Sequence, residues 1–195
     1  IGSGLSCPAL ESINLTYPDC ISEMQLEADE LAIIGVPVYA GRVAASAVHR
    51  LQNIHGRNTP AILVVLYGNR EYEDALIELR DLTQKNGFIP VAASAFIGEH
   101  SFSSDDMPIA AGRPDRVDLQ EAENFGTRVV EKLSMLSDIS SLGTIVVPGN
   151  STYKEGMGPM PFTPQVDQGV CSACGECIAA CPTGAGETDI SGCCG

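Results

Sequence analysis

The chain has 195 residues, of which 44% are hydrophobic and 18% charged, a composition typical of a globular protein with a substantial core. Its formal net charge of −14 at pH 7 opposes binding to nucleic acid or to an anionic membrane, because Lys and Arg must neutralise phosphates there. The longest apolar run, residues 61–67, falls far short of the roughly 20 residues that cross a bilayer. We therefore expect no nucleic-acid partner and no membrane association.

Apolar segments of strand length alternate along the chain with segments whose apolar residues recur at helical spacing. Continuous apolar runs are typical of strands that are buried on both faces of a sheet. The alternation of strands and helices predicts an α/β fold with a doubly wound parallel sheet. In chain order we expect an edge strand 11–15, strand 31–38, helix 42–54, strand 60–67, helix 71–86, strand 88–96, helix 118–136 and extended chain at 144–147.

A region rich in Gly and Pro, without periodicity, follows the predicted sheet. It covers residues 148–168 and is interpreted as a linker. Since it is also rich in Met, Tyr and Phe, we expect it to pack along one domain. The chain then divides into a domain 1–147, the linker, and a small C-terminal domain 169–195.

Two loops at the carboxyl ends of predicted strands each combine aromatic residues, a glycine and an arginine. In open α/β sheets ligands lie beyond these strand ends, and a planar ring could be held between such aromatic side chains. Ordinary core-edge tyrosines and surface arginines are the alternative, and the sequence leaves it open. The candidate residues are Tyr39, Ala40, Gly41 and Arg42 in the first loop, and Tyr67, Gly68, Asn69, Arg70 and Tyr72 in the second.

Candidate catalytic residues are scarce. His100 follows the third long strand, and we favour a hydrogen-bonded loop histidine over an acid–base group there. We find no Ser/His/Asp grouping and no triple-glycine dinucleotide motif. The catalytic residues, if there are any, are left unknown.

The most specific motif is a run of four cysteines, Cys171, Cys174, Cys177 and Cys181, followed by Pro182. This spacing matches the bacterial ferredoxin run that holds an iron–sulfur cubane. Thiolates on a tight loop can reach different irons of one cluster, and the loop's N–H groups stabilise its negative charge. Zinc is less favoured, because structural zinc sites usually present two Cys pairs a dozen or more residues apart. Disulfides are less favoured still, since the cysteine usage suits a reducing cytoplasm.

Taken together, these regions resemble the flavodoxin–ferredoxin fusion family, in which a flavodoxin-like domain precedes a bacterial-type 4Fe–4S ferredoxin domain. The resemblance is carried by residues 35–42, 67–70 and 171–182. It implies a cytoplasmic electron-transfer protein with a 4Fe–4S cluster and with FMN, whose ring would lie between the two loops. The acidic chain would then dock to redox partners through a basic surface of the partner.

Two departures from the family pattern set further expectations. Flavodoxins begin with a strand and a Ser/Thr-Gly phosphate loop, and neither is found here, so we expect the first strand to be missing. In two-cluster ferredoxins the fourth Cys of each run ligates the other cluster. The fourth ligand is therefore open between Cys181 and Cys193 or Cys194. We expect a chain truncated at both ends that holds at most one cluster.

Two rival functions accompany the electron carrier. One is a flavin-dependent reductase of a small molecule that uses the ferredoxin part as its electron inlet, with His100 as the candidate acid–base residue. The other is a non-redox module in which the cluster is structural.

Overall fold

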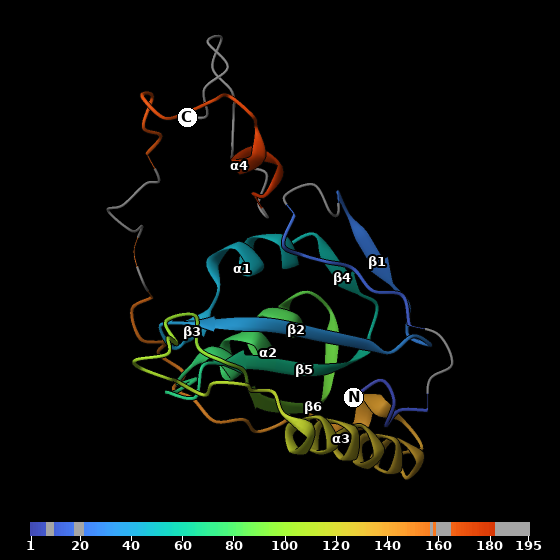
Figure 1. Cartoon of the computed structure of the whole chain (residues 1–195). Coiled ribbons are helices and arrows are strands. Elements are labelled where there is room, and N and C mark those ends of the chain that lie inside the picture. Colours follow the sequence, from blue (N-terminus) through green and yellow to red (C-terminus); the bar gives the residue numbers. More distant parts are fainter. Residues whose placement is uncertain (7–9, 18–21, 157, 159–164, 182–195) are drawn as a thin grey trace.

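The computed structural model describes residues 1–6, 10–17, 22–156, 158 and 165–181 (Figure 1). At its centre lies a four-stranded sheet of order β3-β2-β5-β6. Strands β2, β5 and β6 are parallel, and β3 returns antiparallel to β2. The strands are β2 (Ala32–Tyr39), β3 (Arg42–Val43), β5 (Thr59–Tyr67) and β6 (Phe88–Ile97).

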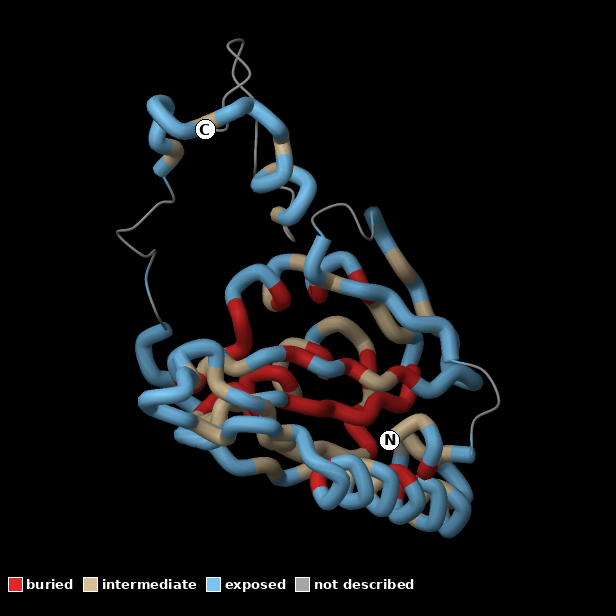
Figure 2. The backbone as a smooth tube through the Cα atoms, in the orientation of Figure 1, coloured by how far each residue is buried: buried red, intermediate tan, exposed pale blue. Residues whose placement is uncertain are grey.

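Helices cover both faces of this sheet. Helices α1 (Ala45–Leu51) and α2 (Ala75–Lys85) pack on the face that carries Leu63 and Val65, whereas α3 (Arg116–Ser134) packs on the face that carries Ile62. The side chains of Leu63, Val65 and Ile62 are fully buried, and burying each contributes roughly 1.5–3 kcal/mol. Figure 2 shows the buried residues concentrated in the central strands. The predicted α/β architecture with a parallel sheet is confirmed.

One edge of the sheet is incompletely covered. Strand β3 pairs only with Val38 and Tyr39, so among the described residues the rest of β2 has a neighbour only on its β5 side. A Cβ placed on the exposed Gly35 would meet nothing within 4 Å. Leu66, which lies on the same face of the sheet as Gly35, is 44% exposed.

The predicted edge strand 11–15 is wrong. Residues 11–15 form no strand, and Leu15 is held instead by its partly buried side chain and by Arg50 Nη1, which donates to its carbonyl at 2.8 Å. A separate two-stranded parallel sheet, which is not expected from the sequence, pairs β1 (Met24–Leu26) with β4 (Ile54–Gly56).

The other elements differ from their predictions mainly at their ends. Helix 42–54 is shorter as α1 because β3 and β4 occupy its two ends. Residues 144–147 are not a strand, although Val147 packs against the core. The remaining short helices are η1 (Ile139–Leu142) and α4 (Glu176–Ala179). In the described part of the chain, no helix combines the length and apolar character needed to span a membrane.

Candidate metal centre and strand-end loops

A tight turn leads into the cysteine run. The side chain of Asp167 accepts from the N–H of Gly169 at 2.8 Å. The carbonyl of Asp167 accepts from the N–H groups of Val170 and Cys171 at 3.1 and 3.0 Å. These bonds fix the first cysteine at the end of a turn.

Two left-handed residues then curl the chain around that cysteine. Ala173 has φ of 53° and Gly175 has φ of 76°. The N–H of Ala173 points back to Cys171 Sγ, with an N-to-S distance of 3.4 Å. A backbone N–H directed at a thiolate stabilises its negative charge, which is the interaction that iron–sulfur sites use.

The environment of Cys174 favours the thiolate. A hydrogen bond from the backbone N–H of Glu176 lowers the pKa of the Cys174 thiol, and the side chain of Ser172 adds to the effect. Cys174 is exposed. Because the thiolate is the metal-binding form, this cysteine is suited to a ligand's role.

The last two cysteines of the run, Cys177 and Cys181, are four residues apart, a spacing that places side chains on the same side of a helix. Cys177 lies in α4, and Cys181 follows that helix with its N–H bonded to the carbonyl of Ile178 at 3.1 Å. Residues four apart on a helix are neighbours on its surface. Cys177 is exposed, whereas Cys181, like Cys171, is half-buried.

The donor set fits an iron–sulfur cluster in chemistry. In residues 165–181, as elsewhere in the described chain, no three His, Cys, Asp or Glu side chains lie together as a metal would need. Pro182, Cys193 and Cys194 lie outside the described residues, so the structure does not address the alternatives for the fourth ligand.

The first strand-end loop is a two-residue turn. Ala40 and Gly41, with φ of 52° and 78°, turn β2 back into β3. The carbonyl of Gly41 accepts from the N–H of Asp74 at 2.9 Å, and a Cβ at Gly41 would collide with Glu73. Tyr39 is 57% exposed at the end of β2.

Arg42 makes structural contacts at this loop. Its Nε and Nη2 donate to the carboxylate of Glu78 at 2.8 and 2.6 Å, and its Nη1 donates to the carbonyl of Lys154 at 2.6 Å. The Arg42 guanidinium also lies 4.9 Å from the centre of the Tyr153 ring. Glu78 raises the pKa of Arg42, chiefly through these hydrogen bonds. All three nitrogens are thus engaged within the protein.

The second strand-end loop packs against the loop that follows β6. The carbonyl of Tyr67 accepts from the N–H of Gly98 at 3.0 Å, and the Tyr67 and Tyr72 rings meet edge to face at 5.3 Å. A Cβ at Gly68 would run into the ring of His100. Asn69 is left-handed, with φ of 58°, and both Asn69 and Arg70 are exposed.

His100 is a hydrogen-bonded loop histidine, as predicted. Its Nδ1 accepts from the N–H of Phe102 at 3.0 Å, and the two rings lie 5.2 Å apart.

Two cavities among the described residues lie away from these loops. One of about 290 Å³ lies between β6 and α3 and is lined by residues such as Phe96, Phe125 and Arg128. The other, of about 400 Å³, lies between the N-terminal turn and α3. Neither is lined by a residue of the strand-end loops, so the flavin contacts predicted there stay predictions.

Comparison with protein families assigns the cysteine run. Residues 164–185 match the 4Fe-4S binding domain family, and the match contains all four cysteines of the run. No curated protein matches the chain. A ferredoxin-type iron–sulfur domain is therefore present at the C-terminal side of an α/β fold, and it indicates a role in electron transfer.

Proposed function

We propose that this protein is an electron carrier in which Cys171, Cys174, Cys177 and a fourth cysteine hold one 4Fe–4S cluster. The observation that carries the proposal is the family match over residues 164–185, which includes the complete run of four cysteines. The backbone turn before Cys171 and the lowered pKa of the Cys174 thiol support it.

The chain's own groups would bind and tune the cluster. When bound, a 4Fe–4S cluster gains and loses one electron at a time. The N–H of Ala173 would stabilise negative charge on Cys171 Sγ. Exposure of Cys174 and Cys177 would keep the site close to the protein surface, where a partner can approach. Cys181 is our choice for the fourth ligand within the described residues, with Cys193 or Cys194 as the alternative.

The partner that this carrier fits is a protein with a basic docking surface in the cytoplasm. The net charge of −14 would attract such a surface and raise the rate of encounter. The same charge argues against nucleic acid and membrane as partners.

A flavodoxin-like α/β domain with FMN at the strand ends is the finer part of the proposal. The residues fit the ring only in part. Tyr39 is exposed and Asn69 is left-handed, but the Arg42 guanidinium is bound to Glu78 and Lys154. The flavin ring would contact Tyr39, Ala40, Gly41, Tyr67, Gly68, Asn69 and Tyr72.

The experiment is a redox titration of anaerobically reconstituted protein, followed by electron paramagnetic resonance with flavin quantified per chain. We expect a cluster that is reduced and reoxidised reversibly by one electron. An iron-loaded protein that cannot be reduced reversibly would favour the structural module instead. Turnover of a small molecule that His100→Ala abolishes, with flavin retained, would favour the reductase.

A further inference from the structure

The chain between the sheet and the cysteine run is fixed to α2 over its first part. Residues 147–155, which we call the strap, lie along α2 (Figure 1). At the start of the strap Val147 packs into the core, and Gly149, with φ of 129°, lies against Ile77 so closely that a Cβ would collide.

Asp74 is the main anchor of the strap. Its residue is 1% exposed. Oδ1 accepts from the backbone N–H and the side-chain amide of Asn150, at 2.8 and 2.9 Å. Oδ2 accepts from the N–H of Lys154 at 2.8 Å. These bonds, led by the one from Lys154, lower the pKa of Asp74 and keep it a charged acceptor.

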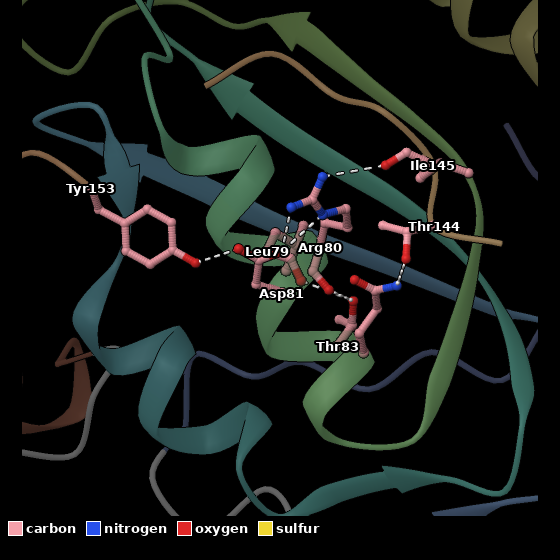
Figure 3. A network of polar contacts seen from close by, with 8 residues as sticks. Leu79, Arg80, Asp81, Thr83, Thr144, Ile145 and Tyr153 are labelled. Atoms are coloured by element: carbon pink, nitrogen blue, oxygen red, sulfur yellow. Dashed lines mark hydrogen bonds and ion pairs between the residues drawn. The ribbon is translucent and has the colours of Figure 1, made fainter. Parts of the chain in front are cut away.

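Tyr153 and Lys154 supply further contacts on either side of Asp74. The Tyr153 hydroxyl donates to Asp81 at 2.6 Å, as Figure 3 shows. Burial, helped by Asp81, raises the pKa of Tyr153 to about 12. The Lys154 ammonium forms an ion pair with Glu73, and the backbone carbonyl of Lys154 accepts a hydrogen bond from Arg42. The chain just before the strap is held too, because Arg80 donates to the carbonyl of Ile145 at 3.3 Å.

The strap ends beside the carboxyl end of β2. A Cβ on Gly156 would lie 3.9 Å from Arg42, which stands at the first residue of β3. Residues 156–170 separate this point from Cys171, and fifteen residues span at most about 50 Å. Were the chain released from residue 147 onward, the same limit would be about 80 Å.

We propose that the strap fixes the place where the cluster-bearing segment leaves the α/β domain, next to the carboxyl ends of β2 and β5. Any effect of the strap on electron transfer rests on the function proposed above. The attachment of the strap to α2 does not depend on that function. The buried carboxylate of Asp74 accepts three hydrogen bonds from the strap and so holds the strap in place. The cluster is thereby kept within reach of the strand-end loops and excluded from the most distant positions.

The test is cleavage of the full-length protein by a lysine-specific endoprotease. The chain has three lysines, and Lys85 and Lys132 lie in α2 and α3, which leaves Lys154 as the reporter. We expect cleavage after Lys154 to be at least about tenfold slower than in a free peptide of residues 147–160, because the site must open first. Asp74→Asn keeps the shape of the side chain, but its amide NH2 then faces an N–H donor of Asn150 or Lys154 and loses a hydrogen bond. We therefore expect it to raise the rate of cleavage after Lys154 by about tenfold.

Matched variants distinguish local release of the strap from unfolding of the whole protein. Glu71→Gln changes an exposed carboxylate in the loop before α2 and should leave cleavage unchanged. On the strap side, Asn150→Ala removes the bond that the side-chain amide donates to Asp74 Oδ1 and keeps the one from the backbone N–H, whereas Ser151→Ala alters an exposed neighbour. If Asp74→Asn loses its circular dichroism spectrum, the comparison of Asn150→Ala with Ser151→Ala decides.

Cleavage of the wild type at the peptide's rate would overturn the proposal. So would equal rates for folded Asp74→Asn, Asn150→Ala and their controls. The iron content of the same samples is measured separately. Protected Lys154 in a protein that binds no iron would leave the strap in place and refute the proposed function.

Discussion

At the scale of single residues, the cysteines of the run differ in what their loss should do. We expect Cys171→Ser, Cys174→Ser and Cys177→Ser each to lose most of the bound iron after anaerobic reconstitution, because each removes a thiolate ligand. Cys174→Ser also removes the thiol whose pKa the loop lowers. The measurement is iron per chain together with the visible absorbance of the cluster.

Cys7, outside the run, gives the matched control, and Cys7→Ser should keep its iron. Comparing Cys181→Ser with Cys193→Ser and Cys194→Ser identifies the fourth ligand. Full iron in the Cys174→Ser protein would contradict the ligand assignment.

Asp118 should make stability depend on pH in acid. It is 6% exposed at the start of α3, where it takes part in a capping box with Asp115 and pairs with Arg113. The hydrogen bonds from Arg113 lower the pKa of Asp118 to about 2. A carboxyl whose pKa is lower in the folded state stabilises the protein above its ordinary pKa of about 3.9, and this stabilisation is lost as pH falls toward 2.

We therefore expect the urea midpoint of the wild type to fall between pH 4 and pH 2 more steeply than that of Asp118→Asn. Asp105→Asn, in an exposed loop, should keep the wild-type slope. Parallel slopes for the wild type and Asp118→Asn would show that this pair does not govern the acid response.

At the scale of elements, the turn between β2 and β3 needs its glycine. Gly41 has φ of 78°, and a Cβ there would collide with Glu73. Gly41→Ala should lower the free energy of unfolding by about 1–2 kcal/mol, from left-handed strain and the clash. Gly98→Ala is the matched control, since a Cβ there meets nothing within 4 Å and should cost under about 0.5 kcal/mol. Equal losses in urea unfolding would mean that the turn is not held as described.

The long elements could be predicted from sequence because their patterns are strong. The apolar runs 31–38, 60–67 and 88–96 are confirmed as β2, β5 and β6, with ends shifted by one residue at most. Strands β1 and β4 were missed because three-residue strands are too short to show a period. The edge strand expected at 11–15 does not form, and of these five residues only Leu15 packs against the core.

In the candidate site, too, some residues could be predicted from the sequence and others could not. The cysteine run could be recognised because its four cysteines lie close together in sequence, and residues 164–185 match the 4Fe-4S binding domain family. Asp74 and Glu78 were missed because acidic residues in and before an amphipathic helix usually face solvent. Here they are buried by partners 76 and 36 residues away, Asn150 and Arg42, and no local pattern records such contacts. The expectation that 148–168 packs along one domain is confirmed for residues 149–154, which contact α2 and the residue before it.

At the scale of the whole molecule, the net charge of −14 should govern encounters with redox reagents. We expect the rate of oxidation of the reduced protein by a cationic cobalt or ruthenium complex to fall as salt rises from 0.01 to 0.15 M, because the Debye length shrinks from about 30 to 8 Å. With anionic ferricyanide the rate should rise instead. Stopped-flow absorbance measures both. The same salt dependence for both reagents would contradict electrostatic steering.

The central claim, that residues 164–185 hold a 4Fe–4S cluster, is tested most directly by metal and sulfide analysis. The protein is purified and reconstituted without oxygen, and iron, acid-labile sulfide and zinc are determined per chain. The account predicts about four iron and four sulfide per chain, with zinc near zero. Zinc in stoichiometric amount, or colourless protein without iron, would contradict it.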